Sequence, residues 1–316
     1  MQSTSAKVVI LGTGGTIAGT AADAADNVGY TAAQIGVASL VAAVPALAGL
    51  PLETEQVAQI DSKSMSHGVW LTLAQRVAHH LARVDVAGVV VTHGTDTLEE
   101  TAWFLQRVLA PSKPVVLTAA MRPATSAQAD GPQNLLDAIR VAQHPGACGV
   151  VAVLAGAVHG AHDVTKSHPF RVDAFSSGDA GPLAWIEEGM LRRLRPWPEG
   201  EALGLAWLGV DAASWPVVDI VTSHAGARAA VVEALCAAGA RGLVVAATGN
   251  GTVHEHLDAA LHAAWQRGVR VWRASRCLGG PIVGGEAEAA HPMPATGLTP
   301  VKARIELMLQ LMRPLD

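Results

Sequence analysis

Residues 89–100, VVVTHGTDTLEE, pass from a run of valines through a polar turn into a helix-forming segment. The valines are typical of a strand buried on both faces, as in parallel sheets that are covered by helices. Thr95 and Asp96 lie where the helix would begin, and either side chain could serve only as a helix cap. Capping explains one polar residue, whereas five in a row are polar. We therefore expect a strand–turn–helix unit with a functional turn, in which Asp96 could hold an ammonium group.

The same alternation of short apolar runs and helical patterns continues along the chain. It predicts two series of such units, each with a mainly parallel sheet. The expected strands of the first series are 8–11, 88–92, 114–118 and 148–154, and its expected helices are 32–44, 98–109 and 133–143. The expected strands of the second series are 217–222, 243–247 and 269–273, and its expected helices are 227–238, 254–267 and 300–312.

These two series predict an α/β fold with a larger N-terminal domain and a smaller C-terminal domain. Residues 196–216 are rich in Pro, Gly and Trp and show no periodicity, so we interpret them as a linker. The predicted domains are residues 1–195, which contain most of the polar motifs, and residues 217–316.

The composition favours a folded protein that binds neither nucleic acid nor membranes. Half of the 316 residues are hydrophobic and the formal net charge is −5, which argues against disorder and against an anionic partner. The uncharged stretch 28–52 contains Pro45 and Pro51, so an amphipathic helix capped by Thr31 fits better than a membrane span. We expect no signal peptide, because the first apolar run is short. The three widely spaced cysteines predict buried thiols, and with no signal peptide expected we predict a cytoplasmic protein.

A glycine-rich loop, GTGGTIAG at residues 12–19, follows the first expected strand. A dinucleotide-binding loop would need glycine in place of Ile17 and an acid about 20 residues later, where the sequence is uncharged. A P-loop would need lysine where Thr20 stands. Since both phosphate-binding functions fail, the loop is best interpreted as presenting Thr16 at the carboxyl end of a strand, where α/β sheets bind ligands.

Two scarce residue types add candidates. Only five of the 22 Lys and Arg residues are lysines, and Lys166 lies in the polar segment DVTKS at 163–167, which suggests a required titratable amine. The single tyrosine, Tyr30, lies in the loop after the glycine run. A lone tyrosine usually packs in a core, but in a loop its hydroxyl could relay a proton.

Together these motifs resemble those of the bacterial-type L-asparaginases, including the glutaminase-asparaginases. The matching blocks are TGGTIAG at 13–19, HGTDTL at 93–98, AMRP at 120–123, Ser126 with ADGP at 129–132, DVTK at 163–166, GNG at 249–251 and PVKAR at 300–304. They follow the family's order nearly end to end. The resemblance implies two α/β domains, no cofactor or metal, and homodimers that pair into homotetramers.

The resemblance also implies the catalytic roles. Thr16 would be the nucleophile, assisted by Tyr30. Thr95 would be the second catalytic threonine, linked to Lys166 and Asp96. A threonine hydroxyl needs a neighbour to take its proton, and a buried lysine could do so through Thr95. Backbone amides of the glycine turn and of the Thr95 helix start could stabilise the oxyanion.

Substrate-binding roles follow in the same way. Thr95 and Asp96 would also contact the substrate, and Ser62 would bind its carboxylate. Asn250 and an acid, Glu286 in preference to Glu288, would reach the site from a neighbouring subunit. Lys63 stands where the family often has Gln or Glu beside the substrate amine, so either its side chain points away or the preference for substrate differs.

The predicted function is hydrolysis of the side-chain amide of L-asparagine to L-aspartate and ammonia through a threonine acyl-enzyme, with weaker glutaminase activity. Two other classes stay open. One is a metallohydrolase that uses some of the thirteen histidines, although His254 and His256 would diverge on a helix and chelate poorly. The other is a non-catalytic amino-acid-binding regulator on the same fold.

Overall fold

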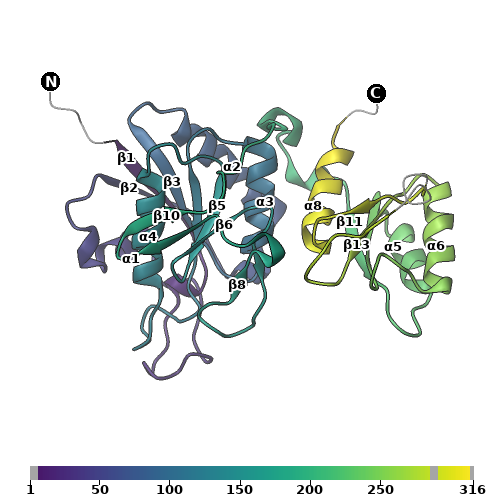
Figure 1. Ribbon diagram of the computed structural model, residues 1–316, viewed down its shortest axis with the longest axis horizontal. Coiled ribbons are helices and arrows are strands. Elements are labelled where there is room, and N and C mark those ends of the chain that lie inside the picture. Colours follow the sequence, from purple (N-terminus) through teal and green to yellow (C-terminus); the bar gives the residue numbers. More distant parts are fainter. Residues whose placement is uncertain (1–5, 285–290, 314–316) are drawn as a thin grey trace. The chain divides into compact units, whose positions relative to one another are not determined.

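Eight strands form the central sheet of the N-terminal part of the chain (Figure 1). They are β1 (Lys7–Gly14), β2 (Leu52–Ile60), β3 (Val86–Thr92), β4 (Val115–Thr118), β5 (Val150–Leu154), β6 (Ala157–Gly160), β9 (Ala184–Glu187) and β10 (Met190–Arg193). Their order is β10-β9-β6-β5-β4-β3-β1-β2. The strands from β5 to β2 run parallel, and β6, β9 and β10 add an antiparallel extension. The predicted, mainly parallel sheet is therefore confirmed.

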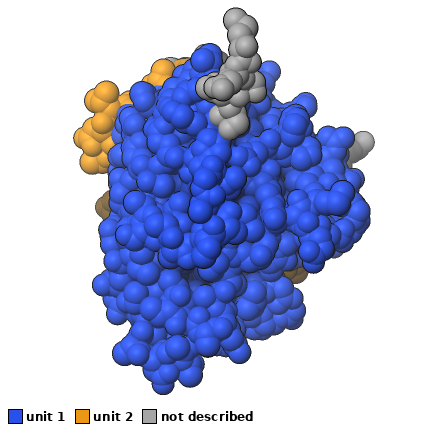
Figure 2. All heavy atoms as spheres, turned by 90° about the vertical axis from the view of Figure 1, so that its left-hand side faces the viewer, with its two compact units in different colours: residues 1–205 blue, residues 206–316 orange. Residues whose placement is uncertain are grey.

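The computed structural model describes residues 6–284 and 291–313. The chain divides into two compact units, Met1–Leu205 and Ala206–Asp316, which Figure 2 colours blue and orange. The division falls inside the segment 196–216, which contains the short 3₁₀ helices Leu205–Leu208 and Ala212–Ser214. The proposed limits of the linker stay a prediction.

Four helices cover the large sheet: α1 (Val37–Ala42), α2 (His67–Leu81), α3 (Leu98–Leu109) and α4 (Gly131–Gln143). Helices α1 and α4 pack on one face, where Val8, Ile10 and Val90 are fully buried in the same cluster. Helices α2 and α3 pack together on the other face (Figure 1), and the rings of Trp70 and Phe104 stack between them at 5.0 Å. Because both faces are covered, the strands can consist almost wholly of apolar residues.

The predicted helix 32–44 is wrong over its first half. Helix α1 begins only at Val37, after Gly36 at its N-terminal cap position, and Thr31 does not cap it. The reason is that the preceding backbone amides bind elsewhere: Ala33 N donates to Gly15 O, and the amides of residues 34 and 35 donate to Ala18 O. This segment supports the glycine loop instead of propagating a helix.

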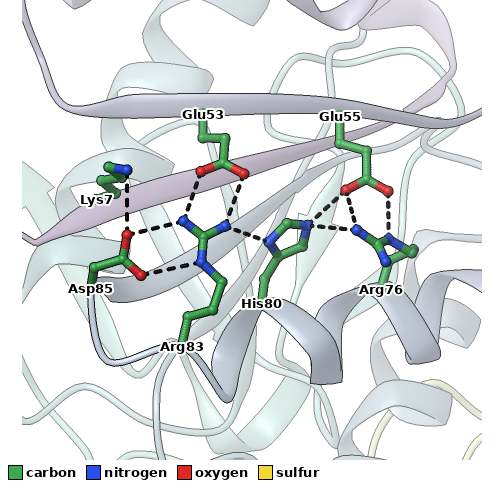
Figure 3. A network of polar contacts seen from close by, with 7 residues as sticks. All are labelled: Lys7, Glu53, Glu55, Arg76, His80, Arg83 and Asp85. Carbon is green, nitrogen blue, oxygen red and sulfur yellow. Dashed lines mark hydrogen bonds and ion pairs between the residues drawn. The ribbon is translucent and has the colours of Figure 1, made fainter.

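Two elements next to this segment were not expected from the sequence, the edge strand β2 and helix α2. Ion pairs join them (Figure 3). Glu53 and Glu55 are two residues apart on β2 and therefore share a face. Arg83 donates to Glu53 at 2.9 Å, and Arg76 donates to Glu55 at 2.6 Å. The hydrogen bonds from Arg76 lower the pKa of Glu55 to about 2, and the buried His80 contacts the same carboxylate at 2.7 Å. Charged side chains on an edge strand also discourage pairing with other chains.

The C-terminal unit is a smaller α/β layer with a parallel sheet in the order β11-β12-β13-β14. Its elements are β11 (Val218–Thr222), α5 (Ala230–Ala237), β12 (Gly242–Ala247), α6 (Glu255–Gln266), β13 (Arg270–Ser275), β14 (Ala295–Thr296) and α8 (Pro300–Leu311). The second predicted series is thereby confirmed in type and order.

Two smaller expectations have separate outcomes. The expected burial of all three thiols is wrong, because Cys148 and Cys236 are half-buried and Cys277 is exposed. No helix in the described ranges is long and apolar enough to cross a bilayer.

Candidate active site

Strand β1 ends in a turn that only glycine can form. Gly14 and Gly15 have φ values of +104° and +83°, in the region that side chains rarely adopt. A Cβ on Gly15 would lie 2.4 Å from the backbone of Gly94, and a Cβ on Gly94 would lie 2.4 Å from Ser62 Oγ. The turns after β1 and β3 are therefore in direct backbone contact, and Thr16 begins the 3₁₀ helix Thr16–Ala18 at this junction.

The Thr16 hydroxyl meets the hydroxyl of the single tyrosine. Thr16 Oγ1 lies 2.7 Å from Tyr30 Oη, and either atom could donate. Thr16 is only 7% exposed. The loop that carries Tyr30 is fastened to the segment after β4, since Asn27 Oδ1 accepts from Ser126 Oγ at 2.6 Å. These contacts hold the two hydroxyls together although 14 residues separate them.

The second group of polar residues forms around Lys166. Lys166 Nζ donates to Thr95 Oγ1 at 2.9 Å and to Asp96 Oδ1 at 2.6 Å. Its backbone amide donates to the buried carboxylate of Glu99 at 3.1 Å, in the first turn of α3. The strand β7 (Thr165–Lys166) that carries it pairs with β8 (Phe175–Ser176). The Lys166 side chain is 18% exposed and that of Asp96 is 50% exposed, so the ion pair borders solvent.

One cavity of about 200 Å³ joins the two groups. Its lining residues are Thr16, Asn27, Val28, Tyr30, Thr95, Asp96, Met121, Lys166, Pro169 and Phe170. A threonine hydroxyl with a neighbouring phenol, a second hydroxyl held by an amine, and a half-exposed carboxylate thus face the same space. This arrangement can support hydroxyl-based acyl transfer on a small substrate with a cationic end.

Ser62 supports the turn that follows β3. It is 2% exposed, and its Oγ accepts the Asp96 amide at 3.2 Å, which leaves its own hydroxyl hydrogen for another partner. Lys63 forms an ion pair outside the cavity lining: its Nζ lies 3.0 Å from Asp61 Oδ2 and its side chain is 70% exposed. The Asp61 hydrogen bond raises the pKa of Lys63, and Asp96 and Tyr30 exert weaker effects in the same direction.

A buried hydrogen-bond chain fixes the turn from the other side. Trp70 Nε1 donates to Thr101 Oγ1 at 2.8 Å, and Thr101 Oγ1 lies 2.9 Å from His93 Nε2. His93 Nδ1 lies 2.6 Å from the carbonyl oxygen of Gly94. A carbonyl can only accept, so Nδ1 carries the proton and Nε2 accepts from Thr101. Complete burial lowers the pKa of His93 to about 4, which keeps the ring neutral.

Comparisons with known proteins identify the family of this chain. The model for the asparaginase N-terminal domain matches residues 7–198, and the model for the glutaminase/asparaginase C-terminal domain matches residues 217–316. The chain belongs to the bacterial-type L-asparaginase family, whose members are amidohydrolases.

Individual relatives of this asparaginase-family chain match over nearly its whole length. It is 37% identical to "Glutaminase-asparaginase" of Pseudomonas fluorescens biotype A, covering 98% of this chain and 88% of the relative. It is 38% identical to "L-asparaginase 2" of Escherichia coli (strain K12), covering 98% and 90%. Among solved structures, "Probable Cytoplasmic L-asparaginase from Campylobacter jejuni" superposes with a TM-score of 0.91 at 36% identity, covering 98% and 96%.

The remaining predicted site residues belong to the C-terminal unit. Asn250 binds the backbone of Val283 twice: its Nδ2 donates to the carbonyl and its Oδ1 accepts the amide, both at 2.7 Å. In this chain, therefore, Asn250 anchors the segment that leads to Gly284. Glu286 and Glu288 lie outside the described residues.

Residues that were not singled out from the sequence also shape the site. Glu99 fixes the backbone of Lys166, and Asp130 fixes that of Met121 and Arg122 by accepting their amides at 2.9–3.1 Å. Asp130 lies inside the motif ADGP and Glu99 directly follows HGTDTL, but the contacts span eight or more residues and cannot be inferred from spacing.

Two of the backbone amides expected to stabilise an oxyanion already have hydrogen-bond acceptors. The Gly15 amide already donates to Ile60 O at 2.9 Å, and the Asp96 amide donates to Ser62, so these two amides are occupied.

Within the described residues, no group of three or more His, Cys, Asp or Glu side chains could hold a metal ion. His254 caps α6 by accepting the His256 amide at 3.3 Å.

Proposed function

We propose that the chain hydrolyses the side-chain amide of L-asparagine to L-aspartate and ammonia through an acyl-enzyme on Thr16, with a weaker activity on L-glutamine. The observation that carries the proposal is that Thr16–Tyr30 and Thr95–Lys166–Asp96 face one cavity of about 200 Å³. Relatives named L-asparaginase and glutaminase-asparaginase support the choice of substrates.

The first half-reaction uses Thr16. Tyr30 Oη, at 2.7 Å, accepts the proton of Thr16 Oγ1 and passes on its own hydroxyl proton as Oγ1 attacks the amide carbon. The tetrahedral intermediate then collapses, its C–N bond breaks, and the leaving nitrogen receives the proton to depart as ammonia. Lys166 donates to Thr95 in the resting site, so Thr95 accepts from the lysine and directs its own hydrogen towards the cavity.

The second half-reaction regenerates the hydroxyl. A water molecule attacks the acyl carbon, Thr95 and Lys166 orient that water, and the ester bond to Thr16 breaks to give aspartate. The two ends of the substrate are held by opposite charges and hydrogen bonds: Ser62 donates to the carboxylate, and Asp96 accepts from the ammonium. Asp96 is suited to this role because its side chain is half-exposed while one oxygen is paired with Lys166.

A coupled ammonia assay with asparagine and glutamine tests the proposal. We expect the native chain to release ammonia from both amides and Thr16→Ala to release none, while its circular dichroism stays native. Thr72→Ala is a matched control, because Thr72 is exposed on α2 and bonds only its own helix, through Gly68 O. Activity that survives EDTA opposes the metallohydrolase, and aspartate binding without ammonia release would establish the regulator instead.

We propose an oligomeric assembly and a location as well. We expect a homodimer or homotetramer, with no nucleic-acid or membrane partner, in which Asn250 and the segment near Glu286 complete the site of another subunit. A cytoplasmic location is supported by the name of the relative from Campylobacter jejuni.

A further inference from the structure

Arg122 is a buried cation directly behind the wall of the proposed active site. It is 8% exposed, and no carboxylate in the described part of the chain forms an ion pair with it. Its Nη1 donates to Phe170 O at 2.8 Å and to Met121 O at 3.3 Å. Its guanidinium carbon lies 4.2 Å from the centroid of the Phe170 ring, and its Nε is buried without a hydrogen-bond partner. Burying an unneutralised charge is costly and calls for an explanation.

Both carbonyls that Arg122 binds belong to residues of the cavity wall. Met121 lines the cavity on the side of β4, and Phe170, with Pro169, lines it on the side of the loop that follows Lys166. Arg122 is therefore the group that connects these two walls. The connection is directional, because a guanidinium presents its donors in a fixed plane and stacks on an aromatic face at the same time.

The base of this connection is rigid, and the loop that it reaches is a hairpin between β7 and β8 whose ends are joined by bonds from the Ser167 and His168 amides to Ala174 O. Asp130 accepts the backbone amides of Met121 and Arg122, and Asn134 Nδ2 donates to the same carboxylate at 3.2 Å. On the far side, Phe170 N donates only to His168 Nδ1 within its own loop, and the Phe170 side chain is 47% exposed. The bond from Arg122 to Phe170 O therefore joins the tip of this hairpin to the segment after β4.

We propose that Arg122 is a positioning residue for the amidase reaction: it holds the Pro169–Phe170 wall in place and presents a positive charge behind a cavity that must receive a carboxylate. This inference rests on the proposed function. Without Arg122, each substrate molecule must order the loop on binding, which raises KM. The reacting groups Thr16, Tyr30 and Thr95 keep their own contacts, so kcat changes little.

Three variants and one control test the proposal. Arg122→Met keeps the length and removes the charge and donors, Arg122→Lys keeps the charge and one donor, and Phe170→Leu removes the stacked ring but keeps the carbonyl. Arg193→Met is the control, because Arg193 is exposed on β10. The measurements are kcat and KM for asparagine, the inhibition constant of aspartate, and the thermal midpoint of each variant.

We expect Arg122→Met to raise KM and the inhibition constant of aspartate by roughly tenfold, with kcat within about threefold of native. Arg122→Lys should recover only part of the loss, because an ammonium keeps the charge but lacks the planar donors and the stacked face. Phe170→Leu should raise KM by about threefold, and Arg193→Met should match the native chain. A native KM in Arg122→Met overturns the inference. So does a parallel fall of kcat and thermal midpoint in both Arg122 variants, which indicates a purely structural role.

A variant that does not fold and a native chain without activity each leave a second measurement that decides the inference. If Arg122→Met does not fold, Phe170→Leu decides, and a native KM in that variant overturns the inference. If the native chain releases no ammonia, the proposed function fails, and the dissociation constants of aspartate for the same variants then test Arg122 separately.

Discussion

Protonation of His93 should limit the stability of this chain in mild acid, and the variant His93→Gln tests this. The ring is completely buried and neutral, and its pKa is lowered to about 4 from the ordinary 6.5. Between these two pH values the unfolded chain binds a proton that the folded chain does not, so unfolding becomes easier as the pH falls. The free energy of unfolding therefore falls as the pH is lowered, beginning near pH 6.5 and ending below pH 4.

The magnitude follows from the width of that window. A difference of about 2.5 pKa units at about 1.4 kcal/mol per unit amounts to about 3 kcal/mol, most of which is already lost at pH 4.5. The structural reason is the hydrogen-bond chain: Nε2 accepts from Thr101, and Thr101 Oγ1 already accepts from Trp70. A proton on Nε2 would place two donors on that hydroxyl and leave the hydrogen of Thr101 without an acceptor.

Urea unfolding followed by tryptophan fluorescence between pH 7 and pH 4.5 measures the effect. His93→Gln should be less stable than native at pH 7, because Gly94 O loses its donor, but should lack about 2 to 3 kcal/mol of the acid-dependent loss. His79→Gln is the control, since His79 is exposed on α2 and should keep the native slope. Equal slopes in the native chain and in His93→Gln would refute the reasoning.

Three further predictions concern catalysis and assembly. Thr95→Val should abolish ammonia release as fully as Thr16→Ala, and the double variant should be little worse in kcat than either single one, because the residues act as a unit; additive losses would contradict this. Asparagine should be preferred over glutamine, by as little as about tenfold, and a native chain faster on glutamine would disprove the preference. Lys63→Gln should leave the ratio of kcat/KM for asparagine to kcat/KM for glutamine within about threefold of native, because Lys63 turns towards Asp61. Inactive Thr16→Ala and Asn250→Ala subunits should regain part of the activity when mixed under conditions of exchange, and exchange confirmed by mass without recovery would exclude a shared site.

The sequence was sufficient to predict the elements whose pattern is local. The apolar runs VVV at 89–91 and LVV at 243–245 are buried strands, because a strand that is apolar on both faces needs helices on both sides. The short antiparallel strands β6, β9 and β10 carry no such signal: each has four residues, and they pair through tight turns such as that at Gly156, with φ +74°. Helix α2 had a usable signal, since Ser66 caps it and Trp70, Leu73, Ala74 and Val77 are buried at helical spacing.

Side-chain contacts were likewise predictable only where they depend on local sequence. The motifs marked Thr16, Thr95 and Lys166 as candidates, but the direction of Lys63 depends on Asp61. The hydrogen bond that His93 Nε2 accepts depends on Thr101 of α3 and Trp70 of α2. Spacing along the chain contains none of this information, because each partner arrives through tertiary packing. The position of Arg122 inside a motif likewise did not reveal that its partner is a carbonyl 48 residues away.

The glycines of the two motifs explain why separate stretches of sequence form one site. Thr16 and Thr95 each follow a glycine at the carboxyl end of neighbouring parallel strands, β1 and β3. Gly15 and Gly94 lie so close that neither has room for a Cβ, and Ser62 closes the same contact from the third turn. A side chain at either glycine would push the turns apart and carry the two hydroxyls out of reach of a single amide. The absence of a side chain at both glycines thus permits the close approach of two backbones, and that approach brings both threonines to the lining of one cavity.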